Sequence, residues 1–197
     1  MRVLAISGGI ASGKSVAAAF FRSRGVPVYD SDSRAKTLYA EDAGLAKAVA
    51  KVCGEEVLSE AGGIDLRRLA KAVFGDESKR RAVEALVHPA VLKDFKAWRQ
   101  VQAALGAELA AIESAILPAL PLFKGSYDKL LVIEAPLEER LRRIKERNGL
   151  GREAALKRVL SQPSHFPGAD WLIVNEGSLS QLEARLEAVL EALRAGA

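Results

Sequence analysis

The residues best suited to chemistry lie near the N-terminus, where Gly8 to Ser15 have the spacing G-x-x-x-x-G-K-S. Glycines permit positive φ angles and let backbone N–H groups approach phosphate oxygens closely. Lys14 adds a positive charge that can reach the β- and γ-phosphates of a nucleotide, and Ser15 offers a hydroxyl to a magnesium ion. The segment predicts a phosphate-binding loop; the alternative is a glycine-rich turn with an incidental Lys-Ser.

A pair of aspartates follows the apolar segment 26–29. Phosphoryl transfer to a hydroxyl needs a residue that takes the proton of the acceptor, and Asp32 is our candidate for that base. Asp30 could orient magnesium through a water molecule. The alternative for either carboxylate is an N-cap on the helix that continues through Arg34.

Arginines are concentrated in a later helical segment, at Arg142, Arg143 and Arg147. Arg143 and Arg147 are four residues apart and therefore share one helix face. Arginine side chains bind phosphate through two parallel hydrogen bonds, and glycines at 149 and 151 would let the segment close over a nucleotide. The alternative is a solvated basic face whose arginines pair with nearby glutamates.

A histidine precedes a proline at His88 and Pro89. Proline lacks a backbone N–H and disfavours helix in the preceding residue, so we expect one helix to end near Val87 and another to begin at Ala90. His88 could contact a phosphate or ribose of the substrate. The alternative is a histidine at a helix break with local hydrogen bonds.

These residues need a scaffold that carries them to one place. Short apolar runs typical of buried parallel strands occupy residues 2–7, 26–29, 108–112, 129–134 and 171–174. Helical patterns lie between them, and this alternation predicts an α/β fold, a five-stranded parallel sheet wrapped by helices. Because ligands bind beyond the carboxyl ends of such strands, we expect the glycine loop and the two aspartates at one edge of the sheet.

A long, almost wholly helical stretch interrupts this alternation. We therefore predict one domain, 1–197, with a helical insert that binds the acceptor and a lid. The core is expected to comprise residues 1–35, 107–136 and 169–197, the insert residues 36–106 and the lid residues 137–168.

Composition narrows the class of protein. The 197 residues are 49% hydrophobic, enough for a full core. The single cysteine, Cys53, excludes a disulfide within the chain and fits a reducing, cytoplasmic setting. A net charge of +4 suits an anionic small substrate, but because basic and acidic residues are interleaved we expect no nucleic-acid binding. We also expect neither a signal peptide nor a membrane span, and we predict no particular oligomeric state.

Taken in order along the chain, these motifs resemble those of the dephospho-coenzyme A kinase family of P-loop kinases. The loop is similar to the family's T-G-G-I-G-S-G-K-S-T, and the end of the chain to its A-D-x-x-I-x-N-x-G-S. The resemblance runs nearly from end to end. The matching segments are 7–15, 28–32, 73–74, 86–89, 141–148 and 169–178.

The resemblance implies transfer of the γ-phosphate of ATP to the ribose 3′-hydroxyl of dephospho-coenzyme A, with Mg²⁺ held by Ser15. It implies that Asp32 is the base, that Lys14 assists the transfer, and that the arginine of the lid is Arg143 or Arg147; we take Arg143 as the one that assists the transfer. The residues implied to bind ATP are Gly9, Ile10, Ala11, Ser12, Gly13, Lys14, Ser15, Val16, Arg147 and Asn175. Those implied to bind the acceptor are Asp32, Phe74, His88 and Glu113. The alternative is another small P-loop kinase that acts on a nucleotide or a small alcohol.

The chain departs from the family pattern at several positions. Val16 stands where a threonine is usual, which removes one hydroxyl beside the phosphates. Leu66 takes the place of an arginine. Ala115 and Ala119 replace the proline and the final glutamate of a stretch whose acidic start remains as Glu113. Most of these departures concern the acceptor side of the expected site.

Overall fold

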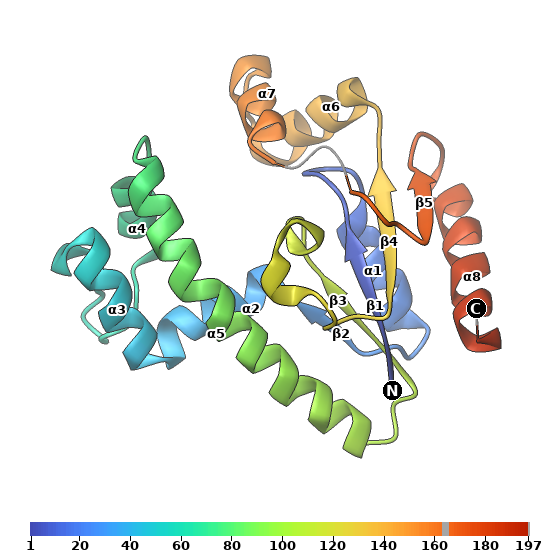
Figure 1. The fold of residues 1–197 in the computed structure, drawn as a ribbon. Coiled ribbons are helices and arrows are strands. Elements are labelled where there is room, and N and C mark those ends of the chain that lie inside the picture. Colours follow the sequence, from blue (N-terminus) through green and yellow to red (C-terminus); the bar gives the residue numbers. More distant parts are fainter. Residues whose placement is uncertain (163–165, 197) are drawn as a thin grey trace. The chain divides into compact units, whose positions relative to one another are not determined.

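The computed structural model describes residues 1–162 and 166–196 (Figure 1). Residues 163–165 of the expected lid and residue 197 of the expected core lie outside the described residues. The strands are β1 (Arg2–Ser7), β2 (Val28–Asp30), β3 (Leu109–Glu113), β4 (Lys129–Glu134) and β5 (Trp171–Val174). The α-helices are α1 (Lys14–Ser23), α2 (Ser31–Glu41), α3 (Ala43–Cys53), α4 (Leu66–Val73), α5 (Glu77–Ala104), α6 (Leu137–Asn148), α7 (Arg152–Leu160) and α8 (Leu179–Ala195).

The described strands form a five-stranded sheet in the order β2-β3-β1-β4-β5, which confirms the expected α/β class. β1 is central and pairs in parallel with β3 and β4, and β4 pairs in parallel with β5. The register sets Ile6 opposite Glu113 and Ser7 opposite Val132. Since parallel strands end at the same edge, the segments after β1, β3 and β4 leave the sheet side by side.

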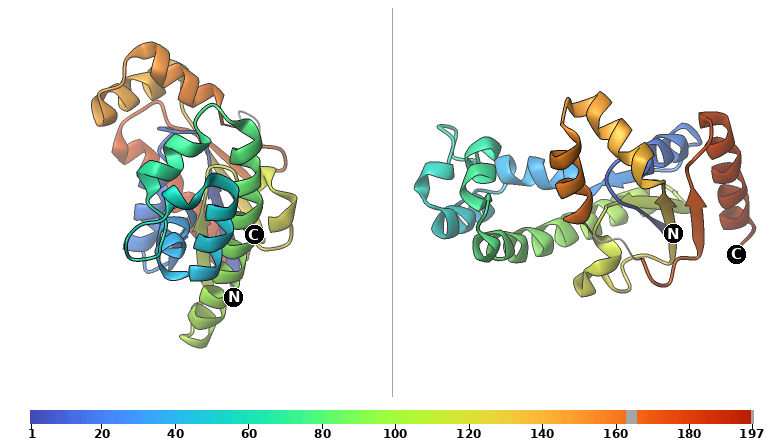
Figure 2. Two further views of the ribbon diagram at one scale, coloured as in Figure 1. Left: turned by 90° about the vertical axis from the view of Figure 1, so that its left-hand side faces the viewer. Right: turned by 90° about the horizontal axis from the view of Figure 1, so that it is seen from above.

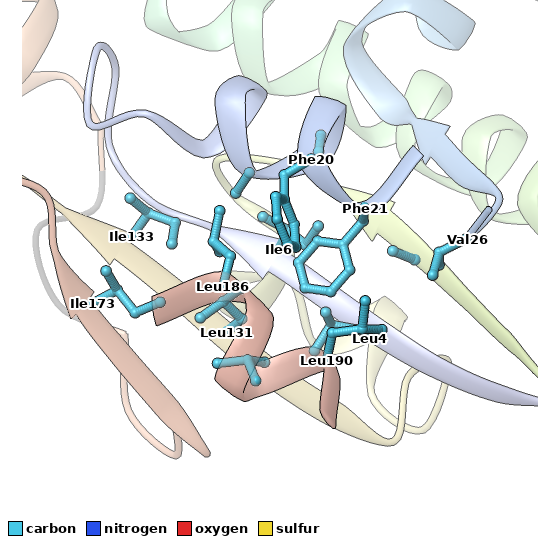
Figure 3. Packing of buried hydrophobic residues seen from close by; sticks show 14 of the residues in the cluster. Leu4, Ile6, Phe20, Phe21, Val26, Leu131, Ile133, Ile173, Leu186 and Leu190 are labelled. Atoms are coloured by element: carbon cyan, nitrogen blue, oxygen red, sulfur yellow. The ribbon is translucent and has the colours of Figure 1, made fainter. Parts of the chain in front are cut away.

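The main core lies between this sheet and the helices α1 and α8 (Figure 3). Phe21 on α1 and Leu190 on α8 are fully buried against Leu4 and Leu131 of the strands. Each such side chain contributes about 2–3 kcal/mol through removal from water. Helix α8 begins at a capping box, in which Ser178 and Gln181 exchange hydrogen bonds. This packing fixes the base of the glycine loop, because the loop joins β1 to α1.

The chain forms two compact units, one of residues Met1–Tyr29 with Gln102–Ala197 and one of residues Asp30–Val101. The second unit contains α2 to α4 and most of α5. Within it, the Arg34 guanidinium bonds both carboxylate oxygens of Asp94, at 3.0 and 2.9 Å, and so ties α2 to α5. Phe95 on α5 is fully buried.

Helix α5 corrects one expectation. The sequence pattern placed a helix break at His88 and Pro89, but α5 continues through Pro89 without interruption. The ring of Pro89 lies on an exposed face, as does Ala85 one turn earlier. The Ala85 carbonyl, which loses its helical donor to the proline, is therefore positioned to take a hydrogen bond from water. His88 is thus a residue of a helix interior and not of a helix break.

Helices α6 and α7 form a pair with a small core of its own (Figure 2). Leu141 and Ile144 of α6 pack with Ala155 and Val159 of α7, where all four are buried. Glycine at position 149, in a left-handed conformation, ends α6 and turns the chain toward α7. Within the described ranges 1–162 and 166–196, no helix has both the length and the apolar character that a membrane crossing requires.

Candidate functional site

The glycine loop after β1 is held in shape by close packing. Gly8 and Gly13 both have positive φ angles, of 147° and 111°. A Cβ at Gly8 would overlap the carbonyl oxygen of Ile133, and one at Gly13 would overlap the side-chain amide of Asn175. Both positions therefore require glycine for backbone conformation and for space.

The loop opens into a pocket at the start of α1. The pocket has a volume of about 180 Å³ and is lined by loop residues between Ile10 and Val16 together with Arg143 and Arg147. Lys14 lies in the first turn of α1, whose N-terminus has no side-chain cap among the described residues. Uncapped backbone N–H groups and the positive end of the helix dipole favour a bound anion here. The structure thus brings most of the predicted nucleotide-binding residues together.

Ser15, which lines this pocket, is bonded to a carboxylate behind it, that of Glu113. The Ser15 hydroxyl donates a hydrogen bond of 2.8 Å to the Glu113 carboxylate, which is only 7% exposed. Glu113 ends β3 and Ser15 belongs to α1, so the pairing of β3 with β1 carries the carboxylate beside the loop. A hydroxyl and a carboxylate are both oxygen donors of the kind that Mg²⁺ prefers, and the pair fits such an ion.

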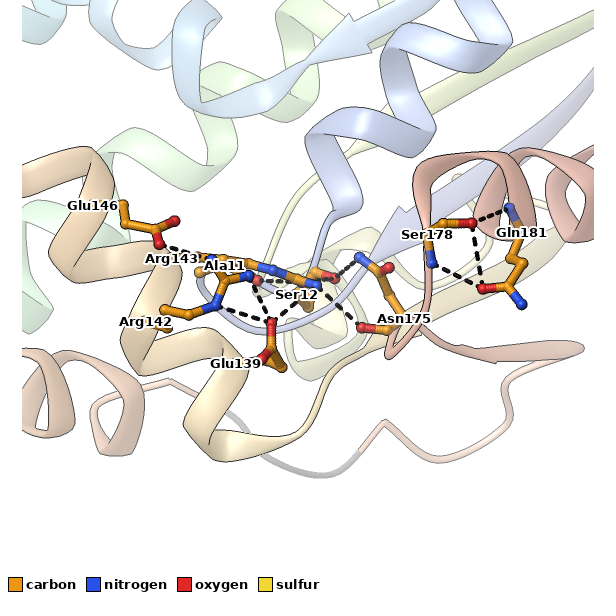
Figure 4. A network of polar contacts seen from close by, with 9 residues as sticks. All are labelled: Ala11, Ser12, Glu139, Arg142, Arg143, Glu146, Asn175, Ser178 and Gln181. Carbon is orange, nitrogen blue, oxygen red and sulfur yellow. Dashed lines mark hydrogen bonds and ion pairs between the residues drawn. The ribbon is translucent and has the colours of Figure 1, made fainter.

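A polar network holds the outer side of the loop (Figure 4). The Arg143 guanidinium donates to the carbonyl oxygens of Ala11 at 3.2 Å, Ser12 at 3.4 Å and Asn175 at 3.3 Å. The Asn175 side-chain amide also donates to the Ser12 carbonyl, at 2.8 Å. These donors occupy loop carbonyls, so the carbonyls are not free to turn toward a bound phosphate.

The arginines of α6 differ in their surroundings. Arg142 is exposed and pairs with Glu139 at 2.8 Å and with Glu146 at 2.7 Å, as expected for a solvated helix face. Arg143 points to the loop, and its side chain is only 26% exposed. Arg147 is exposed and lines the pocket. The solvated-face alternative therefore describes Arg142 and does not describe Arg143.

The aspartates belong to the second unit, at the start of α2. Asp30 is the N-cap of α2, and its two carboxylate oxygens accept hydrogen bonds from the N–H and hydroxyl of Ser33, at 3.0 and 2.8 Å. The capping alternative is therefore correct for Asp30. Asp32 is exposed in the first turn of α2, and within residues 30–101 none of the described side chains pairs with its carboxylate. The Asp32 carboxylate thus serves no cap in this helix.

Phe74 and His88, the other predicted acceptor residues, also lie in the second unit. Phe74 follows α4 and its side chain is 87% exposed, so its ring is available to a ligand. Burial lowers the pKa of His88, against an opposing effect of Glu84 one turn earlier. His88 is therefore neutral at pH 7, with one ring nitrogen able to donate and the other able to accept.

The sequence model that describes dephospho-CoA kinases matches residues 2–181 of this chain. The chain belongs to the dephospho-CoA kinase family. A dephospho-CoA kinase of Bacillus licheniformis is 36% identical over 192 residues, which cover 96% of this chain and 95% of the relative.

Solved structures share the fold of this chain. A crystal structure from Thermus thermophilus shares 36% identity with a TM-score of 0.79, over 98% of this chain and 97% of that one. The dephospho-CoA kinase of Campylobacter jejuni, 24% identical with a TM-score of 0.72 over 100% and 99% of the two chains, shares the fold. Membership in the dephospho-CoA kinase family makes the chain a kinase, and thus an enzyme that uses ATP as co-substrate.

Two residues at the loop were missed by the sequence analysis. Arg140 on α6 donates from Nε to the Ile10 carbonyl at 2.9 Å, and the Gln162 side chain accepts from the Ile10 N–H at 2.5 Å. The chain separations are 130 and 152 residues, and neither contact follows from a local pattern. Only the basic character of α6 could have directed attention to Arg140.

Proposed function

We propose that this chain transfers the γ-phosphoryl group of ATP to the ribose 3′-hydroxyl of dephospho-coenzyme A, giving coenzyme A. The observation that carries the proposal is the pocket at the start of α1, where the loop, Lys14 and Arg143 meet beside Ser15, whose hydroxyl bonds Glu113. Family membership supplies the acceptor, since the relatives are dephospho-CoA kinases.

The positive charges of the pocket support phosphoryl transfer. Lys14 and Arg147 line the pocket beside the loop N–H groups, together with Arg143. In the transition state, charge develops on the transferred group and on the leaving oxygen. Fixed cations in a partly enclosed site stabilise this charge more than water does. We assign Lys14 and Arg143 to that role, and Arg147 and Asn175 to binding of the nucleotide.

Magnesium belongs to the proposal as the ion that accompanies ATP. Ser15 and Glu113 are the residues that would hold it, Ser15 through its hydroxyl and Glu113 through its carboxylate. When bound, the ion would neutralise part of the negative charge on the β- and γ-phosphates. Glu113 was expected on the acceptor side, and its bond to Ser15 supports a role on the metal side.

The acceptor is assigned to the second unit. Asp32 is the proposed base that takes the proton of the 3′-hydroxyl, which agrees with its exposed carboxylate in the first turn of α2. The exposed ring of Phe74 suits stacking with a base, and neutral His88 suits a hydrogen bond to ribose or phosphate. In this proposal residues 36–106 form the acceptor-binding insert and residues 137–168 the lid.

A comparison of acceptors tests the proposal. Purified protein is supplied with Mg²⁺ and ATP, and ADP formation is measured with dephospho-coenzyme A, nucleoside monophosphates, shikimate or gluconate. We expect turnover with dephospho-coenzyme A at a kcat/KM at least about 100-fold above the others. Phosphorylation at the 3′-position is verified by phosphorus NMR. Turnover with only one of the other acceptors would refute the proposal.

A further inference from the structure

Ile10 is the third residue of the glycine loop. Its side chain, its N–H and its carbonyl each contact a residue from α6, from α7 or from the segment that follows α7. Its side chain packs against the buried cluster that contains Leu141 and Ile144. Its N–H donates to the side-chain oxygen of Gln162, and its carbonyl accepts from Nε of Arg140. Both backbone polar groups of Ile10 are therefore fixed by side chains from outside the loop.

The Arg140 guanidinium also lies directly against Gly9. A Cβ built on Gly9 would overlap Nη2 and would lie 2.8 Å from Cζ of Arg140. Gly9 is not among the glycines with positive φ, so its backbone is open to other residues. A side chain at Gly9 would therefore require the half-buried Arg140 guanidinium to move from its place against the loop.

We propose that Arg140 is a positioning residue of the nucleotide site, which sets the shape of the loop by bonding the Ile10 carbonyl and packing on Gly9. Arg140 acts through the loop and does not serve as a phosphate ligand. Arg140 is not among the residues that line the pocket, whose arginines are Arg143 and Arg147. The inference rests on the proposed function only in that the loop binds ATP.

This contact has two parts, the hydrogen bond to Ile10 and the packing on Gly9, and substitutions can separate them. Nε2 of a glutamine is separated from Cα by the same number of bonds as Nε of an arginine. Arg140→Gln therefore keeps a donor for the Ile10 carbonyl and removes the guanidinium from Gly9. Arg140→Ala removes both. Gly9→Ala introduces the methyl group that the wild-type guanidinium obstructs.

The experiment measures the Kd of MgATP without acceptor by isothermal titration calorimetry for R140A, R140Q, G9A and G9A/R140Q. We expect a Kd raised about 10-fold for R140A and for G9A, the effect of one lost hydrogen bond to a charged donor. We expect R140Q and G9A/R140Q to bind within about threefold of the wild type, so that the second substitution rescues the first. R142A is the matched control, since Arg142 pairs only with glutamates of its own helix among the described residues.

Two results would overturn the inference. One is R140A binding with wild-type affinity, and the other is G9A/R140Q binding as weakly as G9A. A purely structural role of Arg140 would lower affinity in R140Q as well and would show no rescue. The outcome is independent of the acceptor, because ATP binding is measured alone. Failure of the dephospho-coenzyme A assay would leave these affinities unchanged.

Discussion

Ser15 donates a hydrogen bond to Glu113 across 2.8 Å, and this bond joins the first turn of α1 to the end of β3. The carboxylate is almost fully buried, and a buried negative charge is stabilised by hydrogen bonds and by cations. A divalent cation at this pair would provide further compensation for that charge. The pair is therefore the part of the pocket best suited to magnesium.

Loss of the Ser15 hydroxyl or of the Glu113 charge should weaken the response to magnesium. We expect Ser15→Ala and Glu113→Gln to lower kcat by about 10–100-fold and to raise the Mg²⁺ concentration for half-maximal rate. The measurement is a magnesium titration of steady-state turnover. Ser23→Ala at the other end of α1 is the control, because the Ser23 hydroxyl bonds only the neighbouring Phe20 carbonyl and Arg24 guanidinium among the described residues. Near-normal magnesium-dependent turnover by Ser15→Ala would contradict the assignment.

Substitutions of Asp30 and Asp32, at the start of α2, should have different effects on turnover. Asp32→Asn should lower kcat by about 10²–10⁴-fold, as expected when a general base is removed, with the KM for ATP little changed. Asp30→Asn should keep kcat, because asparagine is as good an N-cap as aspartate. The measurement is kcat of each variant, from initial rates at saturating ATP and acceptor. Equal activity of the two variants would exclude Asp32 as the base.

Ala11 has a φ angle of 60°, the only positive value at a non-glycine position in residues 1–162 and 166–196. An alanine in this conformation costs about 1–2 kcal/mol, partly offset by its smaller loss of entropy on folding than glycine. We expect Ala11→Gly to raise the free energy of unfolding by about 0.5–1 kcal/mol. Urea denaturation measures it. The same change at exposed Ala19 within α1 should instead cost about 1 kcal/mol, and equal signs would refute the argument.

His88 should make stability depend on pH. Burial lowers its pKa in the folded protein, below the value of about 6.5 in the unfolded chain. The unfolded chain therefore binds a proton first as the pH falls, so the free energy of unfolding decreases from about pH 7 downward, until the pH passes the folded pKa. Denaturation of the wild type and of His88→Gln from pH 8 to pH 5 measures this. The variant should have the flatter profile, and parallel profiles would exclude His88 as the cause.

Local patterns predicted the elements well where a short segment contains the whole signal. The loop between residues 8 and 15 follows β1 and leads into α1, and the apolar segments form the strands, as expected. The pattern was wrong at Pro89. There, tertiary packing of α5 keeps the helix continuous, although the proline removes one helical hydrogen bond.

The sequence by itself determined the phosphate-binding loop, the α/β class and the resemblance to a kinase family, since these depend on residue types at short spacing. Only the tertiary structure decided which arginines of α6 face the loop, that Asp30 is a cap, and that Glu113 bonds Ser15. The physical reason is distance along the chain. Ile10 meets Gln162 across 152 residues, and such a contact arises only when strand order and helix packing bring remote segments together.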